Sequence, residues 1–183
     1  MNTVSGSILA GAMAALLTSA IPAADAPQPP KPTPEHRKLG YFVGEWKSEG
    51  EVMASALGPG GKTSAHDKCE WFEGGYSVIC RGDNQSPAGA SKSLSVLSYS
   101  VMEKVYTYYS TESNGMVMIS IPRGTLKDGT WTFTDASPMQ GQVVKSRVSI
   151  KEVSPSQYTF LMEFEDEGSK WMTVMKSTAT KFK

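Results

Sequence analysis

The sequence is poor in the residues that most enzymes and metal proteins use for chemistry. It contains two cysteines and two histidines in 183 residues, and it lacks the H-E-x-x-H, C-x-x-C and G-x-S-x-G motifs. Its 18 basic and 18 acidic residues give a formal net charge of zero. Because no basic block is present, electrostatics do not favour a nucleic-acid partner. We therefore expect no catalytic residues, no metal site, no resident cofactor and no nucleic-acid partner.

The sequence also lacks an apolar run long enough to span a bilayer. Residues 8–17 are apolar and are followed by small residues, which predicts a secretory signal peptide over residues 1–26. No Lys or Arg precedes this run, so an uncleaved anchor is the alternative. Residues 27–33 are rich in proline and predict a stiff linker. We expect a periplasmic or secreted bacterial protein with no stable membrane span after cleavage.

Helical periodicity is almost absent after Phe42. Short alternating segments are bounded instead by Gly, Asn, Asp, Pro and Ser, which is typical of an all-β sandwich or barrel. About ten strands joined by short turns fit the chain, which predicts one antiparallel up-and-down β-barrel over residues 34–183. Thr33 and Pro34 suit the start of a short helical turn before the first strand, and Gly40 suits its end.

The two cysteines fall opposite one another in a predicted hairpin. If Gly74 and Gly75 form the turn, Cys69 faces Cys80. In an exported protein this placement predicts a disulfide. A two-residue loop would make them a hydrogen-bonded pair, whereas a four-residue loop would make them a non-hydrogen-bonded pair with closer side chains. A redox or metal pair is the rival interpretation.

Three further hairpins are predicted from turn residues. They turn at Asn114-Gly115, Asp128-Gly129 and Glu167-Gly168. The first would pair Tyr108 with Ile121, the second Leu126 with Trp131, and the third Phe164 with Trp171.

These registers predict an aromatic and methionine face that points into the barrel. Eight or more strands can enclose one small ligand, and methionine suits loosely specific apolar pockets. An interior filled by its own side chains is the alternative. The candidate ligand-binding residues are Trp71, Tyr106, Tyr108, Phe160, Met162, Phe164, Trp171 and Met175.

A family resemblance rests on Leu39 to Trp46, with its Gly44-Glu45-Trp46 motif, and on four later segments. These are Cys69-Glu70-Trp71 with Gly74-Gly75, Tyr106 to Tyr109 with Ser113 to Gly115, Gly129 to Phe133, and Gly168 to Trp171. Over residues 34–183 their order and spacing resemble the bacterial DUF1579 family, whose function is unknown. The G-x-W motif resembles that of lipocalins and related calycin barrels.

The resemblance implies a calycin-like barrel in which Gly44 and Trp46 are structural residues at the base. In lipocalins a basic residue of the last strand packs over this tryptophan. The resemblance makes Lys181 and Lys183 the candidates for that contact.

We therefore expect an exported calycin-like barrel that binds a small apolar or amphipathic ligand and is not an enzyme; its oligomeric state stays open. One alternative is a haem- or gas-binding barrel, which would need His36 or His66 to point inward. Another is a ligand-free envelope interaction module. A third, an enzyme, would need a polar cluster inside the barrel, for which the candidates are Glu45, Glu70, Tyr106 and Ser110.

Overall fold

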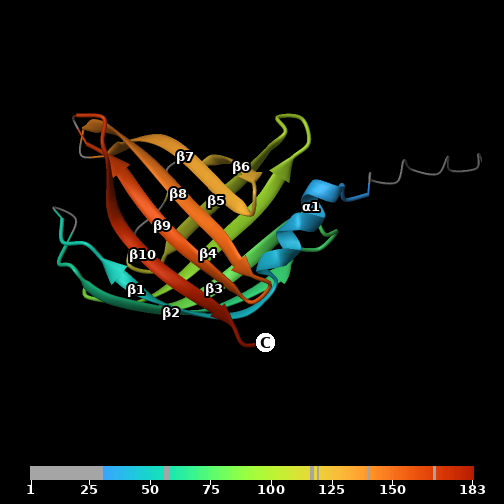
Figure 1. Ribbon diagram of the computed structural model, residues 1–183, viewed down its shortest axis with the longest axis horizontal. Helices are drawn as coiled ribbons and strands as arrows, with labels where there is room; N and C mark the ends of the chain where they lie inside the picture. The colour runs from blue at the N-terminus through green and yellow to red at the C-terminus, as the bar shows by residue number, and fades with distance from the viewer. Residues whose placement is uncertain (1–30, 56–57, 116–117, 119, 140, 167) are drawn as a thin grey trace, which may run out of the picture. The chain divides into compact units, whose positions relative to one another are not determined.

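Ten antiparallel strands close into a barrel, preceded by a short helix (Figure 1). The computed structural model describes residues 31–55, 58–115, 118, 120–139, 141–166 and 168–183, so the predicted signal peptide lies outside them. The elements are α1 (Pro34–Lys38), η1 (Leu39–Phe42), β1 (Gly44–Val52), β2 (Gly61–Trp71), β3 (Ser77–Ser86), β4 (Gly89–Ser100), β5 (Val105–Glu112), β6 (Arg123–Lys127), β7 (Thr130–Met139), β8 (Gln142–Ser154), β9 (Gln157–Glu165) and β10 (Trp171–Lys181).

Each strand pairs with its neighbours in sequence, and β1 pairs with β10 to close the barrel. This confirms the predicted all-β, up-and-down barrel with a short helix before the first strand. Side chains alternate between the interior and the outer surface, as strand geometry requires. The helices lie at the end where β1 begins and β10 finishes (Figure 1). We call this the closed end, and the opposite end the mouth.

The short helix begins as predicted but does not stop at Gly40. Thr33 is the N-cap and its N–H donates to His36 Nδ1 at 3.1 Å, while Pro34 occupies the first turn. The chain continues through Gly40 as the 3-10 helix η1. A side chain at Gly40 would come within 3.2 Å of Trp71 Cζ2, so this glycine allows the Trp71 ring to pack against the helix. No helix in the described part of the chain has the length and apolarity to cross a membrane.

Trp46 joins the helical segment to the first and last strands. Its side chain is 1% exposed, and its Nε1–H donates to the Phe42 carbonyl at 2.7 Å. Lys181 places its Nζ 4.7 Å from the Trp46 ring centroid and donates to the carbonyls of Tyr41 and Val43 at 3.1 and 2.9 Å. The family resemblance correctly indicated this lysine contact, which fastens β10 over the end of η1.

Gly44 is required by the same junction. Its φ of 130° is unfavourable for residues with a side chain, and an added Cβ would lie 2.6 Å from the Lys183 carbonyl oxygen. The Glu45 N–H donates to that same carbonyl at 3.0 Å. The G-x-W motif is therefore the place where the carboxyl-terminal end of the chain crosses the start of β1.

The β2–β3 hairpin has the predicted register, with Cys69 opposite Cys80 and a disulfide between them. The Phe72 N–H donates to the Ser77 carbonyl at 2.9 Å, so the loop has four residues. Alternation then makes the cysteines a non-hydrogen-bonded pair, and their Cα atoms are 4.0 Å apart. Both cysteines are buried in the hydrophobic core, so the disulfide lies in the inner wall of the barrel.

Of the other hairpins, the one at Asp128-Gly129 is confirmed, since Leu126 faces Trp131. The Asn114-Gly115 register is wrong where it can be checked, because the Tyr108 N–H bonds to the Pro122 carbonyl and Tyr106 faces Gly124. Pro122 has no N–H to donate to the ladder. Residues 116, 117 and 119 of this prediction lie outside the described residues.

The last hairpin is also out of register with the prediction. Trp171 faces Glu165 rather than Phe164, because Asp166 closes the loop with its carboxylate, which accepts the N–H groups of Gly168 and Lys170. A bulge between Thr173 and Met175 then restores the inward face of β10.

Replacing Trp46 by Ala should lower the free energy of unfolding by about 3–5 kcal/mol, because it empties the closed end and removes the Phe42 hydrogen bond. Urea denaturation would measure this change. Trp171→Ala is the matched control, since it removes a tryptophan from the outer surface and should cost far less. A loss below about 1 kcal/mol for Trp46→Ala would contradict the structural role given to this residue.

Candidate functional site

The closed end of the barrel is filled by its own side chains. Leu39 and Phe42 of η1 are buried against inward residues of the strands. The ring centroid of Trp131 lies 5.1 Å from that of Phe42 and 4.8 Å from that of Tyr106. These contacts form an apolar floor. Its buried members are Leu39, Phe42, Trp46, Val78, Leu97, Tyr106, Trp131, Ile150 and Ala179.

Above the floor the inward side chains are no longer fully covered. Tyr108, Tyr158, Phe160 and Met162 pack against the core but each keeps some accessible surface. The Tyr158 ring centroid lies 4.8 Å from that of Trp46, and the Tyr108 ring centroid lies 5.6 Å from that of Phe133. This burial raises the pKa of Tyr108 to about 12 and that of Tyr158 still further. Side chains that are deep and yet accessible line an internal space, which we call the lumen.

Toward the mouth the lumen wall becomes polar. The inward positions of β4 are serines that alternate with outward residues and retain accessible surface. Serines on β5, β7 and β8 continue this polar zone. Its members are Ser91, Ser93, Ser95, Ser110, Ser137 and Ser146. The lumen is thus apolar at depth and hydrogen-bonding near its opening.

Asp67 is the most unusual group in this wall. It lies at an inward position of β2, between Trp46 on β1 and Gly82 on β3. A Cβ added to Gly82 would lie 2.4 Å from Asp67 Oδ1 and 2.5 Å from Ser93 Oγ, so the glycine makes room for both groups. Within the described part of the chain, the Asp67 carboxylate has no hydrogen-bond donor or ion-pair partner.

This environment alters the ionisation of Asp67. Burial raises the pKa of its carboxyl from 3.8 to about 6, with His66 opposing the rise and Asp83 adding to it. The negative charge of Asp67 in turn contributes to the raised pKa values of Tyr108 and Tyr158, after the larger effect of their own burial. Trp46 is the cross-strand neighbour of Asp67 and its ring centroid lies 4.8 Å from that of Tyr158, so Trp46 lies next to both residues.

Six of the eight predicted ligand-binding residues occupy inward positions well inside the barrel. Tyr106 belongs to the floor, and five line the space above it: Tyr108, Phe160, Met162, Phe164 and Met175. Trp71 instead packs against Gly40 at the closed end and is 38% exposed.

Trp171 was placed on the wrong face by the predicted hairpin register. Its ring lies 4.3 Å from the Arg147 guanidinium carbon, and Arg147 Nη2 pairs with Glu163 Oε2 at 2.7 Å. Arg147 alternates with the buried inward residues Val148 and Ile150, so this cluster lies on the outer surface. Trp171 is therefore removed from the candidate site.

The sequence analysis missed Asp67, although a signal for it was present. Asp67 precedes Cys69 by two residues, so the two share a strand face. The predicted cysteine pairing put Cys69 next to the core, and the same alternation implies an inward carboxylate. The polar residues considered for an enzyme are not grouped, since Glu45 and Glu70 contact His66 and Arg81 on the outer surface.

Neither histidine is placed to bind a ligand in the lumen. His36 is 2% exposed, and its ring packs edge-on against Tyr76 and Tyr99 at the closed end. His66 points outward, with Nε2 3.4 Å from Glu45 Oε2. No group of three metal-ligating side chains occurs among the described residues.

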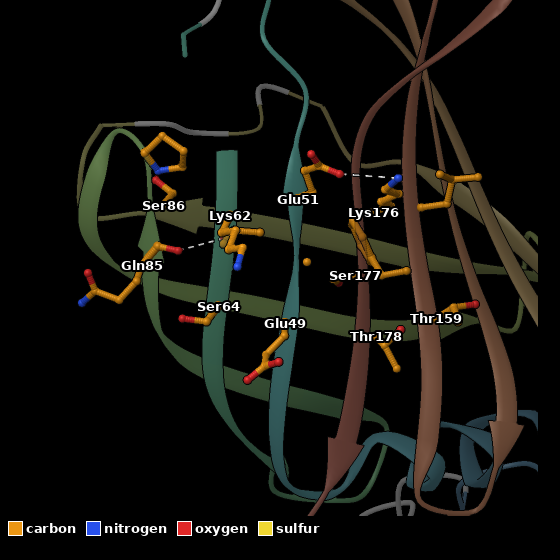
Figure 2. A pocket seen from close by; sticks show the side chains of 15 residues that line it. Glu49, Glu51, Lys62, Ser64, Gln85, Ser86, Thr159, Lys176, Ser177 and Thr178 are labelled. Atoms are coloured by element: carbon orange, nitrogen blue, oxygen red, sulfur yellow. Dashed lines mark hydrogen bonds and ion pairs between the residues drawn. The ribbon is translucent and has the colours of Figure 1, made fainter. Parts of the chain in front are cut away.

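Two hollows lie on the outer side of the barrel wall. Figure 2 shows one of about 1150 Å³, whose lining includes Glu51 on β1 and Lys176 on β10, an ion pair at 3.5 Å. The other, of about 770 Å³, is lined by charged residues that include the ion pair of Asp83 and Lys92. Because the charges of these two ion pairs are exposed and already paired with each other, we place the candidate site in the lumen.

Replacing Asp67 by Asn should stabilise the protein above pH 7. The folded state binds the Asp67 proton more tightly than the unfolded chain, so this group's contribution to stability falls as pH rises from about 4 to about 6. Removing the charge should raise the free energy of unfolding by about 1–3 kcal/mol at pH 8, as measured by urea denaturation. The difference in the free energy of unfolding between variant and wild type should shrink at pH 4, where the Asp67 carboxyl of the folded protein is protonated.

Glu70→Gln is the control, because Glu70 is exposed on the outer surface and pairs with Arg81. It should bring no stabilisation at pH 8. An Asp67→Asn protein no more stable than wild type at pH 8 would show that the carboxylate has a favourable partner.

Solved structures of low sequence identity share this fold. The S-type phycobiliprotein lyase CPES from Guillardia theta matches with a TM-score of 0.54 at 14% identity, over 81% of this chain and 93% of that one. Rv2717c from M. tuberculosis matches with a TM-score of 0.58 at 8% identity, over 84% and 100%. A DUF3598 protein of unknown function from Nostoc punctiforme PCC 73102 matches with a TM-score of 0.52 at 12% identity, over 79% and 49%.

A search of curated protein sequences gave no significant match. The family comparison is more specific than the structural one, since the model described as "Protein of unknown function (DUF1579)" matches residues 31–181. The chain belongs to the DUF1579 family.

Proposed function

We propose that this protein binds a small, largely apolar molecule in the lumen of its barrel. The observation that carries the proposal is the set of inward side chains Tyr108, Tyr158, Phe160 and Met162, which lie deep in the barrel and keep accessible surface. Aromatic and methionine side chains around an internal space are typical of sites for apolar ligands. The serines near the mouth would contact the polar end of an amphipathic ligand.

The placement of the remaining residues favours binding without catalysis. In the described residues, the lumen wall holds no histidine or free cysteine that could act as a base or nucleophile. His66 lies outside the barrel and His36 is enclosed by aromatic rings, which also disfavours the haem alternative. Similarity to a phycobiliprotein lyase is compatible with a barrel that accepts a small molecule, but fold alone assigns no function.

We further propose that the protein acts in an oxidising compartment, periplasmic or extracellular. The buried Cys69–Cys80 disulfide and the apolar run at residues 8–17 support this location. Thiol titration of unfolded protein, purified from its own compartment with free thiols blocked, should detect no free thiol before reduction and two afterwards. Two free thiols before reduction would contradict the proposed location.

Ligand binding can be tested with N-phenyl-1-naphthylamine, a neutral apolar fluorophore. Its emission should rise on entering the lumen, and the titration should saturate near one molecule per barrel. Ser95→Trp should weaken binding by about tenfold or more, because Ser95 is a small, half-buried inward residue and the indole would occupy the space. Circular dichroism would check that the barrel still forms.

Leu94→Trp is the matched control on the same strand. Leu94 is 38% exposed on the outer face, so its replacement should leave the affinity within about twofold. Absence of saturable binding to the wild type, or equal effects of the two tryptophan substitutions, would contradict a ligand site in the lumen.

A further inference from the structure

We propose that the lumen selects a ligand with an apolar body and a protonated amine, whose charge pairs with the Asp67 carboxylate. This inference rests on the proposed function and specifies the ligand class.

The charges that face the lumen are predominantly negative. Above the floor, the inward positions of the described strands carry three carboxylates: Asp67, Glu112 and Asp135. A fourth inward carboxylate, Glu152, lies at the closed end beside the floor residue Trp131. The one basic side chain on the inner face is Lys181, whose ammonium is already bound to two backbone carbonyls at the floor. The other lysines and arginines of these strands alternate onto the outer surface. The lumen is therefore negatively charged and favours a cation.

Among the inward carboxylates, Asp67 alone lacks a hydrogen-bond donor within the described residues. Glu112 accepts a hydrogen bond from Ser91 at 2.8 Å. Asp135 accepts from Ser120 and Ser137. Glu152 accepts from Trp131 Nε1 at 2.8 Å. A partly buried carboxylate without a partner is unfavourable for folding, and an ammonium group of a ligand would supply both the missing donor and the missing charge.

Aromatic side chains lie near the Asp67 carboxylate. Tyr108 and Tyr158, which keep accessible surface, are close enough to respond to its charge, whereas its cross-strand neighbour Trp46 is buried and already lies under the Lys181 ammonium. Aromatic rings beside a carboxylate form a favourable environment for an ammonium group. Ser93 Oγ, which shares the space left by Gly82, offers an additional acceptor.

Isothermal titration calorimetry with three ligands of equal chain length tests this inference. At pH 7.5, decylamine should bind about tenfold or more tightly than decanol, and decanoate should bind more weakly than decanol, since charge-assisted hydrogen bonds lie in this range. Asp67→Asn should remove the preference for decylamine and leave decanol within about twofold of its wild-type affinity. Glu70→Gln, which likewise replaces a carboxylate by its amide but on the outer surface, should leave all three affinities unchanged.

The pH dependence provides a second readout. Decylamine stays protonated below pH 9, so its binding to the wild type should weaken as pH falls from 7.5 to 5 and Asp67 becomes protonated. His66, Asp83, Tyr108 and Tyr158 are the titratable groups coupled to Asp67. Both tyrosines stay neutral between pH 5 and pH 7.5. Decylamine binding to the Asp67→Asn protein should lose its pH dependence even though His66 is still present, because the titrating carboxylate has been removed.

The outcomes separate this inference from the proposed function. If decanol binds as tightly as decylamine, or if Asp67→Asn keeps the amine preference, the inference is overturned while the lumen remains a ligand site. If decanoate binds most tightly, the lumen does not favour a cation and the inference is overturned. If none of the three ligands binds and N-phenyl-1-naphthylamine does not bind either, the proposed function fails and this inference fails with it.

Discussion

The contact of Trp46 with η1 and Lys181 is the constraint on which the rest of the barrel depends. The indole donates to the Phe42 carbonyl, and the Lys181 ammonium lies over its ring while binding two further carbonyls at the end of η1. These three contacts join the start of β1 to the end of β10, the two strands that must meet for the sheet to close. They also hold the helical segment across one end of the barrel, so that side chains fill the core at that end and the lumen begins above it.

The division between a packed floor and an accessible lumen explains why an unfavourable carboxylate can persist. Asp67 lies between Trp46 and Gly82 in the barrel wall, and burial raises the pKa of its carboxyl to about 6. A neutral side chain of the same size would be more favourable for folding. Natural proteins often retain such groups at binding sites, where stability is given up for function. The proposed amine ligand would restore the missing interaction, so binding and folding would be coupled at this residue.

Much of the architecture could be predicted from the sequence, because hairpin registers follow from turn residues when the turn is regular. Gly74-Gly75 correctly placed Cys69 opposite Cys80, and Asp128-Gly129 placed Leu126 opposite Trp131. The predictions failed where the backbone departs from a regular ladder. Pro122 interrupts the partner of β5, and a longer loop with a bulge in β10 turns Trp171 outward. Asp67 was missed because its importance comes from its neighbours across the lumen, which sequence spacing alone does not reveal.

We propose that the barrel carries a small molecule in its lumen. Native mass spectrometry of protein purified from its own cells without detergent can detect such a bound molecule. We expect a bound species that is released on denaturation, and solvent extraction should identify it as an apolar molecule with a basic nitrogen. A clean apo mass, together with no uptake of apolar amines or neutral lipids offered to the protein, would contradict the account and would favour a barrel that serves as an interaction module.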